Sequence, residues 1–259
     1  TKNTGWIQIS DPVKDMELDK LRQERTHILI ESKLQSENID CLYSPITIAF
    51  QDSERSYIEK EWDREVKGKP IIFDGKLVHV KRQDFSQSNL VFDTCMSSFK
   101  EWIGTKSNEF EKIFGRNRVI KPLSVGSMIV TADNKWIIGR RSKTYDFERQ
   151  YTLLGGYLDP EKDIVNSKPN PFHAIRREIE EETGIDKKHD IGSVICLGLD
   201  GIDQPYLAFS TQLKISYDEL VYGTPKEKEF ITLDGYENEK RSLENFVTTN
   251  YKELTPHTL

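Results

Sequence analysis

The order of hydrophobic and polar positions predicts a chain of short strands and helices whose character changes near residue 118. Before that point, short β-rich runs alternate with charged, helix-like stretches. Asp74-Gly75 is a favoured two-residue turn between β-rich runs and therefore predicts a hairpin over 71–80. The other predicted strands of this part are 6–9, 44–50 and 90–92, and the predicted helices are 13–25, 56–66 and 97–103.

Beyond residue 118 the chain is richer in strands. Strands are predicted over 125–131, 135–139, 151–154, 193–198 and 205–215, with one long polar helix between the third and the fourth. Sheet and helix are therefore mixed in this part, which predicts an α+β fold. The change of texture predicts two domains, 1–118 and 119–259.

Composition and charge narrow the kinds of partner. The 259 residues are 36% hydrophobic, enough for a sizeable core, and no apolar run approaches the roughly 18 residues that span a bilayer. The net charge of −6 argues against binding to nucleic acid, and the three scattered cysteines predict neither disulfides nor a zinc site. Residues 1–6 lack the apolar segment of a secretory signal, so we expect a cytoplasmic protein. The oligomeric state stays open.

The long polar helix has clear boundaries. Asn170 is a good N-cap, Pro171 suits the first helical position, and Gly184 is placed to end the helix in a left-handed conformation. A stripe of apolar side chains at helical spacing predicts that one face packs on a sheet: Phe172, Ile175 and Ile179.

Three glutamates share an adjoining face of this helix. Glu178, Glu181 and Glu182 stand at i, i+3 and i+4, where like charges repel each other. One interpretation is a solvated charged face that Arg176 and Arg177 partly neutralise. The other is a site for a divalent cation, because Mg²⁺ prefers carboxylate oxygens.

Two features upstream of the helix bear on this choice. Gly155 and Gly156 end a predicted strand, where they either let a ligand approach the backbone closely or simply form a turn. Arg140 and Arg141 carry guanidinium groups that suit phosphate oxygens, although the alternative is an ordinary basic pair on the surface.

The glycine pair and the glutamate-bearing helix together resemble the Nudix box, Gly-x5-Glu-x7-Arg-Glu-U-x-Glu-Glu-x-Gly-U, where U is a bulky aliphatic residue. Residues 177–185 fill its second half without a substitution. Gly155 and Glu161 satisfy the first half, but fifteen residues instead of seven then precede Arg177. We therefore expect a loop inserted over about 162–168 that leaves the helix intact and puts the role of Glu161 in question.

The insertion resembles that of one Nudix subgroup, which contains the UDP-glucose pyrophosphatases of animals and related plant proteins. Residues 98–105 and 139–142 are similar to further elements of this subgroup, and the likeness extends over roughly 90–235. It implies an α/β/α sandwich preceded by a smaller mixed α/β domain. It also implies Mg²⁺-dependent hydrolysis, with Mn²⁺ as an alternative, of UDP-glucose or UDP-galactose to UMP and a sugar 1-phosphate.

Three other functions are alternatives to the hydrolysis of a UDP-sugar. The same chemistry could act on ADP-ribose, GDP-mannose or another nucleoside diphosphate derivative. A Nudix domain that only senses a nucleotide sugar is favoured by the altered first half of the box and disfavoured by the complete glutamate triplet. A plain α+β interaction domain would require the box to be a coincidence.

The resemblance assigns roles to the box residues. It implies that Glu178 and Glu182 are the principal metal ligands, with Glu181 a third ligand, direct or through water. Arg177 would orient these glutamates by charge-assisted hydrogen bonds. The backbone of Gly155-Gly156 would complete the metal shell or face the phosphates.

Residues outside the box would supply the rest of the site. Glu227 is the candidate general base and Glu229 its alternative, unless both lie on an ordinary solvated loop. Arg140 and Arg141 would bind the substrate phosphates. An aromatic side chain would stack on the base, with three candidates: Tyr151, Tyr145 and Phe147.

Overall fold

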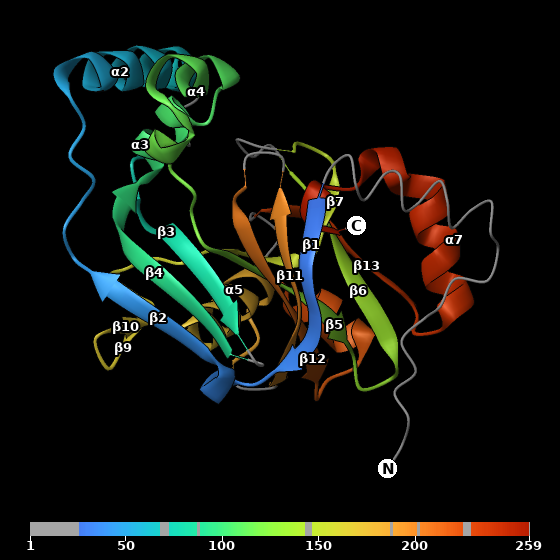
Figure 1. The fold of residues 1–259 in the computed structure, drawn as a ribbon. Coiled ribbons are helices and arrows are strands. Elements are labelled where there is room, and N and C mark those ends of the chain that lie inside the picture. The colour runs from blue at the N-terminus through green and yellow to red at the C-terminus, as the bar shows by residue number, and fades with distance from the viewer. Residues whose placement is uncertain are drawn as a thin grey trace.

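The computed structural model describes residues 26–67, 73–86, 89–142, 147–186, 189–200, 203–224 and 229–258. Within them lie a large mixed sheet, a three-stranded sheet and a strip of two short strands, with helices packed around them (Figure 1). The predicted α+β fold class is confirmed. The strand predicted over 6–9 and the helix predicted over 13–25 lie outside the described residues.

The large sheet contains most of the strands predicted beyond residue 118. Its order is β1 (Thr26–Leu34), β11 (His189–Asp200), β12 (Pro205–Leu213), β5 (Ser124–Val130), β6 (Lys135–Arg141) and β13 (Phe230–Glu237). Two short strands extend it: β7 (Tyr151–Thr152) pairs with β6, and β8 (Leu154–Tyr157) pairs with β5. Only β12 and β5 run parallel, and every other pair is antiparallel.

Helices cover both faces of this sheet. Ile137 of β6 lies in the main core together with Ile175 and Ile179 of α5 (Pro171–Thr183). Its neighbours along the strand point to the other face, because successive side chains alternate. There Trp136 and Ile138 pack against Phe246 of α7 (Lys240–Asn250). The sheet is thus the middle layer of an α/β/α sandwich. A further short helix, α6 (Tyr217–Gly223), follows β12.

The small sheet and three helices form the other part of the molecule. The sheet order is β2 (Ile39–Ser44), β4 (Asn89–Ser98), β3 (Lys76–Ser86). Helices α2 (Asp52–Val66), α3 (Phe99–Thr105) and α4 (Asn108–Phe114) gather at one end of it (Figure 1). The helix predicted over 56–66 is confirmed and begins four residues earlier. Short 3₁₀ turns cover Ser36–Asn38, Arg116–Arg118, Tyr251–Glu253 and Pro256–Thr258.

Two strand predictions in this part are wrong over the described residues. No strand forms over 45–50, and the observed strand β2 ends at Ser44, where the predicted one begins. Pro45 has no amide hydrogen to continue the ladder. In the described part of the hairpin predicted over 71–80, Phe73 lies in no strand and the strand after Asp74-Gly75 pairs with β4 instead. Residues 71 and 72 lie outside the described residues. The Asp74 carboxylate instead accepts a hydrogen bond from the Lys100 amide at 2.8 Å, and the Gly75 carbonyl accepts one from Phe99 at 2.8 Å. This turn therefore holds the start of α3.

Two features cross residue 118. β1 joins the edge of the large sheet by antiparallel pairing with β11. Buried side chains of the small sheet, among them Val78 and Phe92, belong to the same hydrophobic core as Ile137 and Ile175. The division into 1–118 and 119–259 stays a prediction. No described helix has the length and apolar character needed to cross a membrane.

One buried histidine predicts how stability depends on pH. His79 is 3% exposed, and its Nδ1 accepts a hydrogen bond from the Lys121 amide at 2.8 Å. Burial lowers the pKa of His79 from 6.5 to about 4. Below pH 6.5 the unfolded chain therefore binds a proton that the folded protein excludes. The free energy of unfolding falls by up to about 1.4 kcal/mol per pH unit from this group as the pH drops towards 4.

His79→Gln should remove this contribution of His79 to the pH dependence of the free energy of unfolding. Denaturant unfolding at pH 7 should show the variant less stable than the natural protein, because it loses packing in a tight core. At pH 4.5 the difference should shrink by about 2–3 kcal/mol, since glutamine takes up no proton. A difference that is the same at both pH values would contradict the assignment.

Candidate active site

The glutamate-bearing helix α5 forms as its sequence predicts. The Asn170 side chain accepts a hydrogen bond from the His173 amide at 2.9 Å, and Pro171 occupies the first turn. Gly184 ends the helix with φ of 71°, and its amide donates to the Glu180 carbonyl. The apolar stripe packs on the sheet, where the Phe172 ring meets Phe209 edge to face. This packing holds the glutamate face against β8.

Glu182 is a buried carboxylate with one satisfied oxygen. The residue is 5% exposed, and its Oε2 accepts a hydrogen bond from the Gly155 amide at 3.0 Å. Its other oxygen, Oε1, is buried and has no hydrogen-bond partner. Burial raises the pKa of Glu182 well above the usual value, and the charges of Glu229 and Glu178 raise it further. A buried carboxylate oxygen without a partner is costly and points to a ligand.

Glu178 lies one turn earlier, against the next glycine. A Cβ atom on Gly156 would come within 2.5 Å of Glu178 Oε1, so the carboxylate lies directly over the backbone. Burial raises the pKa of Glu178 to about 7; the Arg177 guanidinium opposes this shift, while Glu181 and Glu229 add to it. The two glutamates thus share one largely buried, acidic environment.

The glycine pair makes this close approach geometrically feasible. Gly155 has φ of +149°, and a Cβ there would meet the Val125 carbonyl oxygen and lie 2.6 Å from the Gly126 Cα. Only glycine fits such a position. Gly155 and Gly156 lie within β8, paired with β5, and each contacts one of the two glutamates.

Arg177 connects several acidic groups. Its guanidinium lies 2.9 Å from Glu178 Oε1 and donates to Glu181 Oε2 at 3.0 Å. It also donates to both carboxylate oxygens of Asp163, at 2.9 and 2.7 Å. Glu181 is more exposed than the other two glutamates and also pairs with Lys162 at 3.3 Å.

Glu229 lies with the glutamate pair. Its carboxylate forms an ion pair with Arg141 at 2.7 Å, and its carbonyl accepts a hydrogen bond from the Ser142 amide. Its negative charge raises the pKa of both Glu178 and Glu182. The alternative base is therefore brought to the site together with Arg141, whereas Glu227 lies outside the described residues.

Arg140 and Tyr151 lie on the other face of the sheet. The Arg140 side chain donates to the Arg149 carbonyl at 3.3 Å, pairs with Glu253 at 3.2 Å and lies over the Tyr151 ring. Tyr151 is buried against Phe246 of α7. Neither is brought to the glutamates, because neighbouring residues of β6 point to opposite faces.

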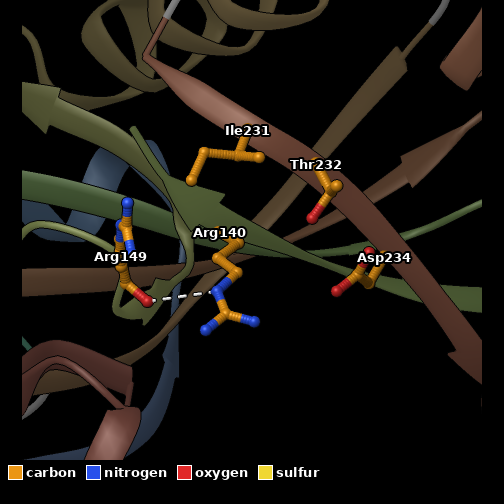
Figure 2. A pocket seen from close by; sticks show the side chains of 5 residues that line it. All are labelled: Arg140, Arg149, Ile231, Thr232 and Asp234. Carbon is orange, nitrogen blue, oxygen red and sulfur yellow. Dashed lines mark hydrogen bonds between the residues drawn. The ribbon is translucent and has the colours of Figure 1, made fainter. Parts of the chain in front are cut away.

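Arg140 instead lines an open hollow of about 380 Å³ on this α7 face (Figure 2). The other residues of the hollow are Arg149, Ile231, Thr232 and Asp234. Of the two alternative aromatic candidates, Phe147 is partly exposed with φ of 57°, and Tyr145 lies outside the described residues. No base-stacking side chain is therefore assigned.

Two residues near the glutamates were not anticipated. Asp163 is fully buried beneath Arg177, and its only signal in the sequence is its place at the start of the expected insertion. Tyr206 of β12 is buried over Gly126, where a Cβ would lie 2.8 Å from the ring carbon Cζ. Burial raises its pKa, with smaller contributions from Cys196 and Glu182. A tyrosine in a strand carries no pattern that marks it as part of a site.

The donor set suits a hard divalent cation. Within the described ranges, no three His, Cys, Asp or Glu side chains already form a group that could hold a metal ion. Glu178 and Glu182 nonetheless lie one helical turn apart, the first largely buried and the second buried, and Glu182 Oε1 has no protein partner. Carboxylate oxygens are the ligands that Mg²⁺ prefers, and a cation would compensate the burial of both charges.

Comparisons with known proteins give weak structural likeness to Nudix hydrolases. No family model and no curated protein matches the chain. Among solved structures, a Nudix hydrolase from M. smegmatis is 15% identical over 52% of this chain and 76% of its own, with a TM-score of 0.35. A Nudix hydrolase from Nitrosomonas europaea is 14% identical over 52% and 80%, with a TM-score of 0.35. A MutT protein from Methanosarcina mazei is 19% identical over 51% and 96%, with a TM-score of 0.29. The function proposed below rests on the site itself.

Proposed function

We propose that this protein is a Nudix-type hydrolase that cleaves the pyrophosphate bond of a nucleoside diphosphate derivative with a divalent cation, Mg²⁺ or alternatively Mn²⁺. The observation that carries the proposal is the unpartnered, buried Glu182 Oε1 together with the largely buried Glu178 one turn earlier. Two acidic side chains are kept together in a largely buried setting, which a purely structural helix would avoid. Glu178 and Glu182 would hold the cation, with Glu181 at the edge of the shell.

A bound cation would supply charge neutralisation for the pyrophosphate. The protein's own residues hold the glutamate carboxylates in a fixed orientation. The Gly155 amide fixes one oxygen of Glu182 and leaves the other for the ion, while Arg177 fixes Glu178 and Glu181. Arg141 is the candidate phosphate contact, because its guanidinium forms an ion pair with Glu229 on the side of the sheet that carries the glutamates.

Glu229 is the general base that this geometry favours, with Glu227 as the alternative. Its carboxylate is close enough to Glu178 and Glu182 to raise the pKa of both. In the proposed step, Glu229 accepts a proton from water as the water oxygen forms a bond to phosphorus. The bridging phosphorus–oxygen bond breaks, and the departing phosphate takes the electron pair.

For the substrate we propose a nucleoside diphosphate sugar, UDP-glucose or UDP-galactose, giving UMP and a sugar 1-phosphate. Support comes from the sequence likeness over 98–105 and from the position of that stretch. Trp102 within it packs against Tyr157 of β8, with ring centroids 5.3 Å apart. The stretch therefore borders the strand that carries the glycine pair.

A substrate panel tests the proposal. UDP-glucose, UDP-galactose, ADP-ribose and GDP-mannose are incubated with the protein in Mg²⁺, Mn²⁺ or EDTA, and products are separated by ion-exchange chromatography. We expect UMP and sugar 1-phosphate from the UDP-sugars, and no products in EDTA. Faster cleavage of ADP-ribose or GDP-mannose would overturn only the choice of substrate. Tight binding without turnover in either cation would overturn the hydrolase and select a nucleotide-sugar sensor.

A further inference from the structure

We infer that Asp163 is the positioning residue that holds Arg177, and through Arg177 holds Glu178, for the reaction proposed above. The catalytic part of this inference rests on the proposed function, but the Asp163–Arg177 contact does not. Asp163 lies outside the helix, at the start of the segment inserted between the glycine pair and α5.

The Asp163 carboxylate is buried and fully partnered. It is 0% exposed, and both its oxygens accept from Arg177, Oδ1 from Nε and Oδ2 from Nη2. Oδ2 also accepts from the Asp159 amide at 2.9 Å, and Oδ1 lies 3.2 Å from His173 Nδ1. A two-pronged pairing of this kind fixes the plane of a guanidinium as well as its position.

Fixing that plane aims the rest of the guanidinium. Nη2 also lies 2.9 Å from Glu178 Oε1 and donates to the Tyr157 carbonyl at 3.2 Å. Nη1 is left to donate to Glu181 at 3.0 Å. If the guanidinium turned, Glu178 would lose its charged partner inside the protein.

The inserted residues leave Asp163 beside the helix. The Asp163 carbonyl accepts a hydrogen bond from the Asn170 amide at 2.9 Å, so both ends of the insertion meet at the helix cap. Between them β9 (Ile164–Val165) and β10 (Lys168–Pro169) form a tight hairpin. Its turn residues, Asn166 and Ser167, have φ of 51° and 64°. The extra length therefore projects as a hairpin beyond Asp163.

Glu161, which fits the spacing of the box, does not make this contact. Its side chain is 64% exposed and pairs with Lys76 of β3 at 2.6 Å. Glu161 and Asp163 are both acidic and lie two residues apart on the same segment. Glu161→Gln is therefore the matched control for Asp163→Asn.

Three measurements test the inference in the whole chain. The Arg177 Nε–Hε signal in a ¹H–¹⁵N spectrum, assigned by its loss in Arg177→Lys, should exchange slowly with water and do so much faster in Asp163→Asn. Mn²⁺ affinity, measured by electron paramagnetic resonance, should weaken by about ten- to a hundredfold in Asp163→Asn. kcat should fall with little change in KM, and Glu161→Gln should match the natural protein within about twofold in all three measurements.

The outcomes separate this inference from the proposed function. A natural protein that neither binds Mn²⁺ nor cleaves any substrate overturns the proposed function, while the Arg177 signal still tests the contact. An unchanged signal in Asp163→Asn overturns the inference, as does an equal loss of affinity in Glu161→Gln. If Asp163→Asn does not fold, Arg177→Lys should show the same loss of Mn²⁺ affinity, because lysine cannot form the two-pronged contact. Unchanged affinity in that variant also overturns the inference.

Discussion

Glu182→Gln should lower kcat of the Mg²⁺-dependent reaction by at least about a hundredfold and make the metal-free protein more stable. The amide keeps the shape of the side chain and can still accept the hydrogen bond from Gly155. It removes the negative charge that a cation needs, so catalysis should fail. It also removes a carboxyl group whose ionised form burial and the neighbouring charges disfavour, as its raised pKa shows, so folding at neutral pH should become easier. We expect a gain of about 1–2 kcal/mol, or a few degrees in Tm.

Thermal unfolding in EDTA and in Mg²⁺, together with kcat, checks this pair of opposite effects. The natural protein should gain stability from Mg²⁺, and Glu182→Gln should gain little. Glu180→Gln is the matched control, since it changes the same charge on the same helix. Glu180 faces away from the site, with its carboxylate 3.7 Å from His189. An active Glu182→Gln variant, or one that is less stable than the natural protein in EDTA, would contradict the assignment.

The helix and its glutamates could be predicted because their signals are local. Asn170, Pro171 and Gly184 act within one turn of the helix ends, and the structure shows each in its expected place. Local signals also explain the failures in the first third of the chain. Asp74-Gly75 satisfies the rule for a hairpin turn, but its hydrogen bonds go to the start of α3. The strand after this turn pairs with β4, which follows later in the chain, and α3 begins directly after β4.

The parts of the site outside the box depend on pairing between distant strands. Arg140 and Arg141 are neighbours in the sequence, yet strand alternation places them on opposite faces of the sheet. Arg141 meets Glu229 because Phe230 of β13 pairs with Arg141 of β6. The spacing of residues 227–229 alone could not place Glu229 beside Arg141, since this contact follows from the register of β13 on β6.

The insertion between the glycine pair and α5 shows that residue spacing alone can select the wrong partner for Arg177. The pattern Gly-x5-Glu selects Glu161, but counting residues ignores where the chain turns. Asp163 lies at the base of a hairpin that returns the chain to Asn170, so it lies next to Arg177 despite the extra residues. A buried carboxylate beside a buried arginine can be recognised only when both are placed in three dimensions.

The glycine pair should respond to alanine in two different ways. In Gly155→Ala the new Cβ would meet backbone atoms of Val125 and Gly126 at φ of +149°, and neither strand can move aside. We expect a loss of about 3 kcal/mol or more in the free energy of unfolding. In Gly156→Ala the nearest atoms belong to the Glu178 carboxylate, at 2.5 Å, which can swing away. Stability should change by less than about 1 kcal/mol, but kcat should fall by about ten- to a hundredfold as Glu178 leaves its place.

Gly223→Ala is the control for the substitution itself, because a Cβ there would have nothing within 4 Å. It should be neutral or slightly stabilising, since alanine restricts the unfolded chain. Urea unfolding should therefore rank Gly155→Ala far below the other two variants, while kcat and Mn²⁺ affinity should single out Gly156→Ala among the two that fold well. A Gly156→Ala variant with natural kcat and Mn²⁺ affinity would show that the position of Glu178 over the backbone is not needed. Catalysis would then depend on Glu182 without the close approach that the second glycine allows.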